Sequence, residues 1–105
     1  MKTIPREQIN RRPSTPGAIL KDIFLDEKEI SQASFAQELS KLTRGKVKVS
    51  TMKTKLSEVI KEKRAMSAEF AILISKILGT NPKMWMNLQT SLDLWEAENN
   101  MDLVS

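Results

Sequence analysis

Hydroxyl and ammonium side chains are concentrated in residues 50–57, STMKTKLS, a stretch with the spacing of an amphipathic helix. Such side chains can recognise DNA bases, because lysine donates to O6 and N7 of guanine, whereas threonine can hydrogen-bond or place its methyl group against thymine. In a DNA-recognition helix, the N-terminal side chains reach the base edges. We therefore expect base contacts from Thr51, Lys53, Thr54 and Ser57.

Basic residues lie on both sides of this stretch, where they could bind the phosphate groups of a DNA backbone. Gln32 begins the preceding predicted helix, where the helix dipole and the free amides favour an anion. The predicted phosphate contacts are Gln32, Arg44, Lys46, Lys48, Ser50, Lys61, Lys63 and Arg64. Two alternatives remain, since Gln32 could be an ordinary exposed residue and the loop cations could be only solvated charges.

The net charge of +4 is unevenly distributed along the chain. Residues 1–40 contain six Lys/Arg and six Asp/Glu, residues 41–64 contain nine and two, and residues 65–105 contain two and five. A run of charge is usually a solvated face. Its coincidence with a predicted helix pair favours phosphate contact, so double-stranded operator DNA is the expected partner.

The composition argues against several classes of function. The 105 residues contain no cysteine and no histidine, which excludes disulfides, zinc fingers, thiol nucleophiles and imidazole bases. Glutamate and lysine remain as acid–base candidates, but none lies in an apolar, pocket-like background, so we expect no enzyme and no cofactor. The longest apolar run, AILI, is too short to span a membrane, and the polar N-terminus is unlike a signal peptide. A cytoplasmic protein without membrane contact is expected.

Five helices are predicted to position these residues. The first begins with Thr15 as N-cap and Pro16 at the first helical position, and it should end near residues 26–28. Its expected buried stripe is Ile19, Leu20, Ile23 and Phe24. The second begins after Ser31, with Ile30 placed for a hydrophobic staple. Its expected buried face is Phe35, Ala36, Leu39 and Leu42.

The connection to the third helix, TRGKVKV, is about seven residues long, whereas three or four are usual in a helix-turn-helix. Its alternation of lysine and valine predicts a short extended segment. Ser50 is the expected N-cap of the third helix. The core stripe of this helix is predicted to be Met52, Leu56, Val59 and Ile60.

Ser67 and Gly79 delimit a fourth helix that is apolar on nearly every side and should lie at the centre of the core. The fifth helix, capped by Asn81, has more apolar residues than one contact face requires, including Met86, Leu94 and Met101. This excess suggests a homodimer, because helix-turn-helix proteins generally bind two half-sites by two-fold symmetry. The predicted dimer interface is Trp85, Leu88, Leu92 and Trp95. Alternatively, both tryptophans close the core of a monomer.

The chain is therefore predicted to be one all-α domain with two extensions. Residues 1–13, with two prolines and few apolar residues, are expected to form a flexible N-terminal arm. Residues 14–98 should form a five-helix, phage-repressor-like helix-turn-helix domain with a C-terminal dimerisation helix, and residues 99–105 a tail.

Several segments together are typical of one family. They are STPGAILKDIFL, ISQASFAQEL, KRAMS and LGTNPKMWMNLQTSLDLWEAE. With these motifs, residues 14–98 resemble the HigA/VapI-type antitoxins of toxin–antitoxin systems, a branch of the phage-repressor-like helix-turn-helix proteins. The resemblance implies a homodimer that represses its own operon and neutralises a cognate toxin, typically a ribosome-dependent nuclease that cleaves mRNA. It also implies that Gln32 contacts phosphate and that the N-terminal arm and first helix can meet the toxin.

The chain departs from the family pattern in the DNA-binding stretch. Family members usually join the second and third helices by a short turn such as Gly-Val-Ser, where this chain has SKLTRGKVKVS. Relative to the family, two further residues are inserted before Leu56. Because two residues rotate a helix by about 200°, the family's base contacts cannot be transferred one by one. A helix-turn-helix regulator of phage type, without a toxin partner, is the alternative function.

Overall fold

The structure is a computed structural model that describes residues 12–101. Its elements are α2 (Pro16–Ile19) continuing directly into the π-helix η1 (Leu20–Leu25), then α3 (Gln32–Leu42), α4 (Val49–Ile60), α5 (Ala68–Leu78) and α6 (Pro82–Asn100). With α2 and η1 counted as one continuous helix, the described part contains five helices and no strand, which confirms the predicted all-α architecture. The predicted arm falls mostly outside the described residues, as do the last four residues of the predicted tail.

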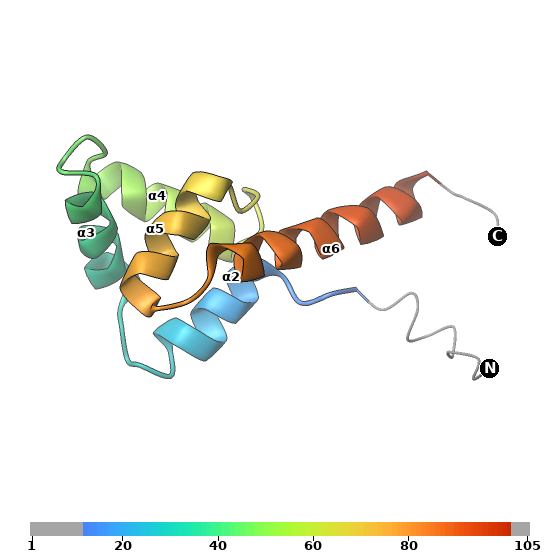
Figure 1. Ribbon diagram of the computed structural model, residues 1–105, viewed down its shortest axis with the longest axis horizontal. Coiled ribbons are helices and arrows are strands. Elements are labelled where there is room, and N and C mark those ends of the chain that lie inside the picture. Colours follow the sequence, from blue (N-terminus) through green and yellow to red (C-terminus); the bar gives the residue numbers. More distant parts are fainter. Residues whose placement is uncertain (1–11, 102–105) are drawn as a thin grey trace.

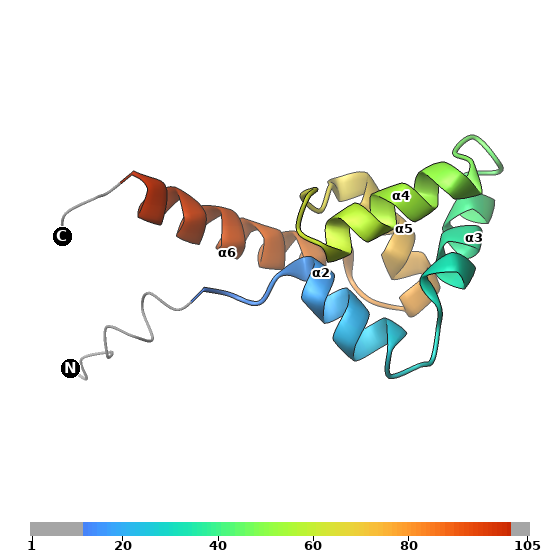
Figure 2. The same cartoon turned by 180° about the vertical axis from the view of Figure 1, so that it is seen from behind.

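Helices α2 to α5 pack around a common core, and α6 begins in that core before its C-terminal half projects away from it (Figure 1). Seen from behind, α4 lies across the front of the molecule with α5 beyond it (Figure 2). The largest fully buried side chains come from every helix and from the α4–α5 connection: Trp85, Phe35, Leu20, Leu25, Leu39, Met52, Leu56, Met66 and Ile74. In this part of the chain, no helix has both the length and the apolar character that spanning a bilayer requires.

Four helix starts are capped as the sequence predicts. The capping oxygens accept hydrogen bonds from first-turn amides at 2.8–3.1 Å, and the four residues are Thr15, Ser31, Ser67 and Asn81. At the other end of α5, Gly79 has the left-handed conformation expected of a helix stop, with φ of 70°. These local signals therefore fix where α2, α3, α5 and α6 begin.

The buried stripe predicted for the first helix is wrong at Ile23, which is 52% exposed, whereas Leu25 is buried. The cause is the π-helical winding of η1, in which the amide of Asp26 donates to the carbonyl of Lys21 at 2.8 Å. Bonds between residues five apart widen the turn. Leu25 therefore follows Leu20 into the core, and Ile23 rotates towards solvent.

Two further burial predictions need correction. Leu42, expected in the core, is 40% exposed because it is the last residue of α3, where the chain turns away. Helix α5 is central, but it is not surrounded by apolar contacts on nearly every side, since Ile72 is 45% exposed. The stripes predicted for α4 are confirmed at Met52, Leu56 and Val59, which are all buried.

Gly17 allows α2 to approach α4 closely. A Cβ at this position would lie 2.1 Å from the carbonyl oxygen of Val59. No real side chain fits at that distance, so the absence of a Cβ sets the packing of α2 against the C-terminal half of α4.

Candidate nucleic-acid interface

Helix α4 presents a polar face opposite its buried stripe. Thr51, Lys53 and Thr54 are exposed and Ser57 is half-buried, so the four predicted base-contacting residues share one exposed region. Lys53, Ser57 and Lys61 form a row at four-residue spacing. The hydroxyl of Thr54 donates to the carbonyl of Ser50 at 3.1 Å, which leaves its lone pairs and its methyl group for DNA.

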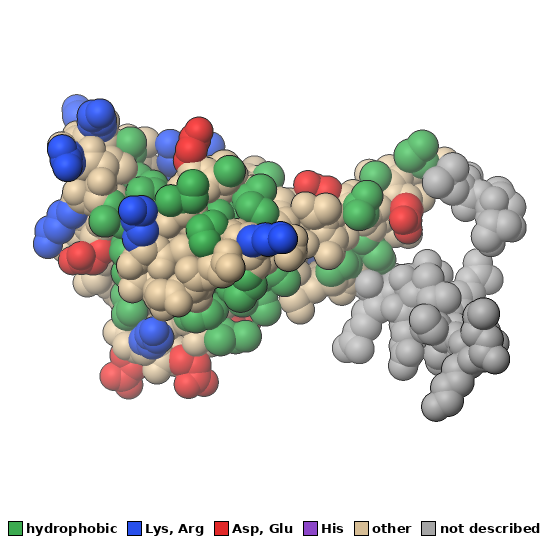
Figure 3. All heavy atoms as spheres, viewed as in Figure 1, with side chains coloured by type: hydrophobic (Ala, Val, Ile, Leu, Met, Phe, Trp, Pro, Cys, Tyr) green, Lys and Arg blue, Asp and Glu red, His purple; other side chains and the backbone are tan. Residues whose placement is uncertain are grey.

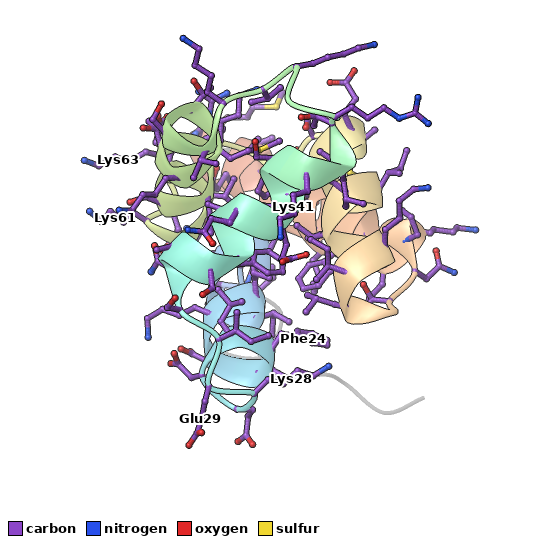
Figure 4. The ribbon with its side chains drawn as sticks, turned by 90° about the vertical axis from the view of Figure 1, so that its left-hand side faces the viewer. Phe24, Lys28, Glu29, Lys41, Lys61 and Lys63 are labelled. Atoms are coloured by element: carbon purple, nitrogen blue, oxygen red, sulfur yellow. The ribbon has the colours of Figure 1, made fainter. Side chains whose placement is uncertain are left out.

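Exposed cations lie at both ends of α4. Arg44, Lys46 and Lys48 precede it, and Lys61 and Lys63 follow its last turn. Basic side chains gather over the α3–α4 connection in Figure 3. Figure 4 shows Lys61 and Lys63 next to each other at one side of the molecule. The 12 residues of α4 span roughly 18 Å, and the DNA major groove is about 12 Å wide. A helix of this length can place cations near phosphates on both sides of a groove.

Residues 43–48, the basic loop, do not form the extended segment predicted from their alternation. The chain instead curls back on itself, with left-handed conformations at Arg44 (φ 56°) and Gly45 (φ 79°). Ser40 Oγ donates to the carbonyl of Val47 at 2.7 Å, and Thr43 Oγ1 accepts from the amide of Val47 at 3.1 Å. Hydrogen bonds between the loop and the end of α3 therefore outweigh the β-propensity of Val47.

Three of the predicted phosphate-contacting residues differ from expectation in their surroundings. Ser50 is not an N-cap, because α4 begins at Val49 and Lys48 occupies the capping position. Gln32 is half-buried at the first position of α3, at the opposite end of that helix from the basic loop. Arg64 Nε donates to Glu58 at 3.3 Å, so part of its charge is already paired. Phosphate contact by all three stays a prediction.

Arg12 forms ion pairs that were not predicted from the sequence. Its guanidinium bonds to Glu62, just past the end of α4, and lies 3.4 Å from Glu96 on α6. The hydrogen bond with Glu62 raises the pKa of Arg12 above its ordinary value. Since Glu62 lies beside Lys61 and Lys63, the pairing offsets a negative charge that would otherwise oppose phosphate there. The periodicity of local sequence contains no signal for contacts across 50 and 84 residues.

The predicted dimer interface is wrong at Trp85 and Leu92. Trp85 is fully buried in the core of its own protomer, where its indole N–H donates to Thr80 Oγ1 at 2.8 Å, and Leu92 is only 7% exposed. Neither has surface available to a second copy. Leu88 and Trp95 are half-buried, whereas Leu94 on α6 and Met101 just after it are more exposed.

The known proteins that this chain resembles are helix-turn-helix regulators and HigA antitoxins. The helix-turn-helix transcriptional regulator YbaQ of Escherichia coli strain K12 is 33% identical over 95 residues, which cover 90% of this chain and 75% of YbaQ. Antitoxin HigA-1 of Vibrio cholerae is 28% identical over 85% of this chain and 74% of its own length. The structure of Pseudomonas aeruginosa antitoxin HigA with the higBA promoter is similar with a TM-score of 0.71 and 32% identity, over 85% of this chain and 86% of the other. No family model matches the sequence.

Proposed function

Because this chain belongs to the HigA-type family of helix-turn-helix antitoxins, we propose that it binds operator DNA upstream of its own gene and represses its operon. The observation that most directly supports this function is the polar face of α4, which has exposed cations at both ends. The similar Pseudomonas HigA structure contains promoter DNA, which supports the same ligand for this chain.

We propose a division of labour along the interface. Thr51, Lys53 and Thr54, with Ser57 behind them, enter the major groove and contact bases. The cations of the basic loop and those after α4 bind phosphates and fix the orientation of the protein on the duplex. Gln32, at the start of α3, binds a phosphate of the same DNA backbone through its side-chain amide.

The assembly proposed to bind this operator is a homodimer formed through α6. Leu94 and Met101 are 59% and 65% exposed and lie seven residues apart, so they share one face of the helix. Trp95 and Leu88, both half-buried, extend the apolar surface towards the core. Two copies related by a two-fold axis would place two α4 helices in successive major grooves, about 34 Å apart.

Toxin neutralisation is the second part of the proposal. A cognate mRNA-cleaving toxin, encoded beside this gene, would bind the N-terminal arm and the first helix. The proposed role is binding without catalysis, and the names of its relatives, which are regulators and antitoxins, support it. We therefore propose a cytoplasmic location, where both operator DNA and an mRNA-directed toxin would be available.

A regulator without a toxin is the alternative, and the name of YbaQ, a transcriptional regulator, is compatible with it. Co-expression with the adjacent reading frame distinguishes the two functions. A toxin partner should copurify with this chain, and its growth inhibition should disappear on co-expression. If no neighbouring product binds, the regulator is the remaining function.

The repressor role is tested with a reporter gene placed behind the DNA upstream of this gene. Expression of the protein should lower reporter output, and scrambling the upstream sequence should restore it. Unchanged output from the native upstream sequence would contradict autorepression.

A further inference from the structure

Helix α4 differs from the other helices in having no side-chain cap at its start. A side chain caps the first turn of α2, α3, α5 and α6, whereas Lys48, the capping residue of α4, makes no side-chain hydrogen bond to that helix. The start of α4 must therefore be held in place by contacts that precede it. Those contacts converge on Val47, one residue before the cap.

Val47 is held at both ends of its backbone. Its amide donates to Thr43 Oγ1 at 3.1 Å, and its carbonyl accepts from Ser40 Oγ at 2.7 Å. The Thr43 hydroxyl also donates to the carbonyl of Ser40 at 2.7 Å. Since Ser40 is buried on α3 and Val47 packs against the core, these bonds connect the basic loop to the body of the protein.

The amides of residues 43–46 also donate to carbonyls of the loop and of the end of α3. Those of Thr43 and Gly45 donate to Ser40, that of Arg44 to Lys41, and that of Lys46 to Thr43, at 3.0–3.3 Å. Arg44 is left-handed although it is not glycine, a conformation that costs free energy unless its surroundings hold it. The conformation of the loop is therefore held by hydrogen bonds within the protein.

We propose that Ser40 and Thr43 are positioning residues for DNA recognition, because their hydroxyls hold Val47 and so fix the start of α4. This inference rests on the proposed DNA-binding function and deepens it. Neither hydroxyl touches DNA. Their role is to present Lys46, Lys48 and the first turn of α4 in one arrangement, so that the long basic loop does not have to order when the operator binds.

Removing one of these hydroxyls should weaken binding to the operator and leave non-specific DNA binding unchanged. If the loop has several conformations, the apparent affinity for the operator falls in proportion to the population of the competent one. Non-specific binding depends on the number of cations, which removal of a hydroxyl does not change. Loss of Thr43 Oγ1 should therefore reduce the preference for operator over unrelated DNA.

The first test uses Thr43→Val, which replaces the hydroxyl by a methyl group of similar size. In the free protein, hydrogen exchange of the Val47 amide, followed by NMR, should become about fivefold to tenfold faster, as expected for one or two lost hydrogen bonds. Amides of α5 should be unchanged, which shows that the fold is intact. Thr43→Ser, which keeps the hydroxyl, should exchange like the wild type, and Ser34→Ala, at an exposed serine of α3, is the matched control.

The second test measures the binding of the same variants to the upstream DNA and to an unrelated duplex of equal length. Thr43→Val should bind the upstream DNA about tenfold more weakly and the unrelated duplex equally well. Ser40→Ala provides a second variant with the same expected pattern. Equal affinity of Thr43→Val and wild type for the upstream DNA would overturn the positioning role, as would a Thr43→Ser variant that behaves like Thr43→Val.

Different results would overturn the proposed function and the positioning role. A wild type that does not prefer its upstream DNA would overturn the proposed function and the positioning role with it, even if Val47 exchange responds as expected. A wild type with a clear preference that Thr43→Val retains would overturn the positioning role alone.

Discussion

Lys53 and Lys63 have the same charge but different positions relative to α4. Lys53 lies in the second turn, on the exposed face, whereas Lys63 follows the end of the helix. Lys53→Ala should therefore relax sequence preference, with a loss of about 1–3 kcal/mol on the preferred base. Lys63→Ala should weaken binding to all sequences and reduce the salt slope by about one. Competition titrations with single-base operator variants measure both effects, and identical behaviour of the two variants would contradict the division into base and phosphate contacts.

Gly17 is the residue at which a single added carbon should have the largest effect. Its Cβ would meet the backbone of Val59, which cannot move without displacing α4. Gly17→Ala should destabilise the protein by about 1–3 kcal/mol through overpacking, which lowers the melting temperature by roughly 4–8 °C for each kcal/mol. Ser91→Ala, at an exposed helical site, should change it little. Thermal denaturation checks the pair, and equal melting temperatures would show that α2 can shift freely.

At the scale of elements, the sequence predicts what is local. Thr15, Ser31, Ser67 and Asn81 could be identified as caps because a capping side chain bonds within its own first turn. The π-helical winding of η1 could not be identified, because the apolar periodicity does not distinguish it from an α-helix. The fold of the basic loop could not be identified from the alternation of lysine and valine, because hydrogen bonds to the end of α3 determine it. In the loop, the bond from Ser40 to Val47 spans seven residues and requires two left-handed conformations between them.

Gln89 joins α6 to the connection between α4 and α5. Its side chain is 7% exposed, accepts from the amide of Met66 at 2.8 Å and donates to Asp93 at 2.8 Å. Gln89→Leu leaves the buried amide of Met66 without an acceptor, so the free energy of unfolding should fall by about 1–3 kcal/mol. Asn87→Leu, at an exposed position of the same helix, is the control. Urea unfolding measures the difference, and a shared midpoint for Gln89→Leu and wild type would argue against this connection.

On the scale of the whole molecule, the charge distribution was more informative than the apolar pattern. Positive charge in residues 41–64 correctly indicated which helices share a basic surface, because charges stay exposed wherever the helices pack. The apolar stripe of α6 did not reveal which side chains meet the protomer's own core. Trp85 packs near Phe24, with ring centroids 5.4 Å apart, a contact that depends on the winding of η1.

The proposed homodimer depends on the projecting end of α6. Leu94→Glu places a charge on the exposed apolar face and should convert the dimer to monomer in analytical ultracentrifugation, with weaker operator binding as a result. Ile72→Glu changes a comparably exposed residue of α5 and should leave the dimer intact. If Ile72→Glu dissociates the protein and Leu94→Glu does not, α5 rather than α6 forms the interface.

The face of α4 and its flanking cations are proposed to recognise one DNA sequence. This recognition can be measured by titrating the purified protein on its own upstream DNA, beside an unrelated duplex of equal length, at several salt concentrations. We expect tighter binding to the upstream DNA and an affinity that falls steeply with salt, because several phosphates are neutralised in each protomer. Equal, weak binding to both duplexes would contradict operator recognition and leave partner binding as the role of this protein.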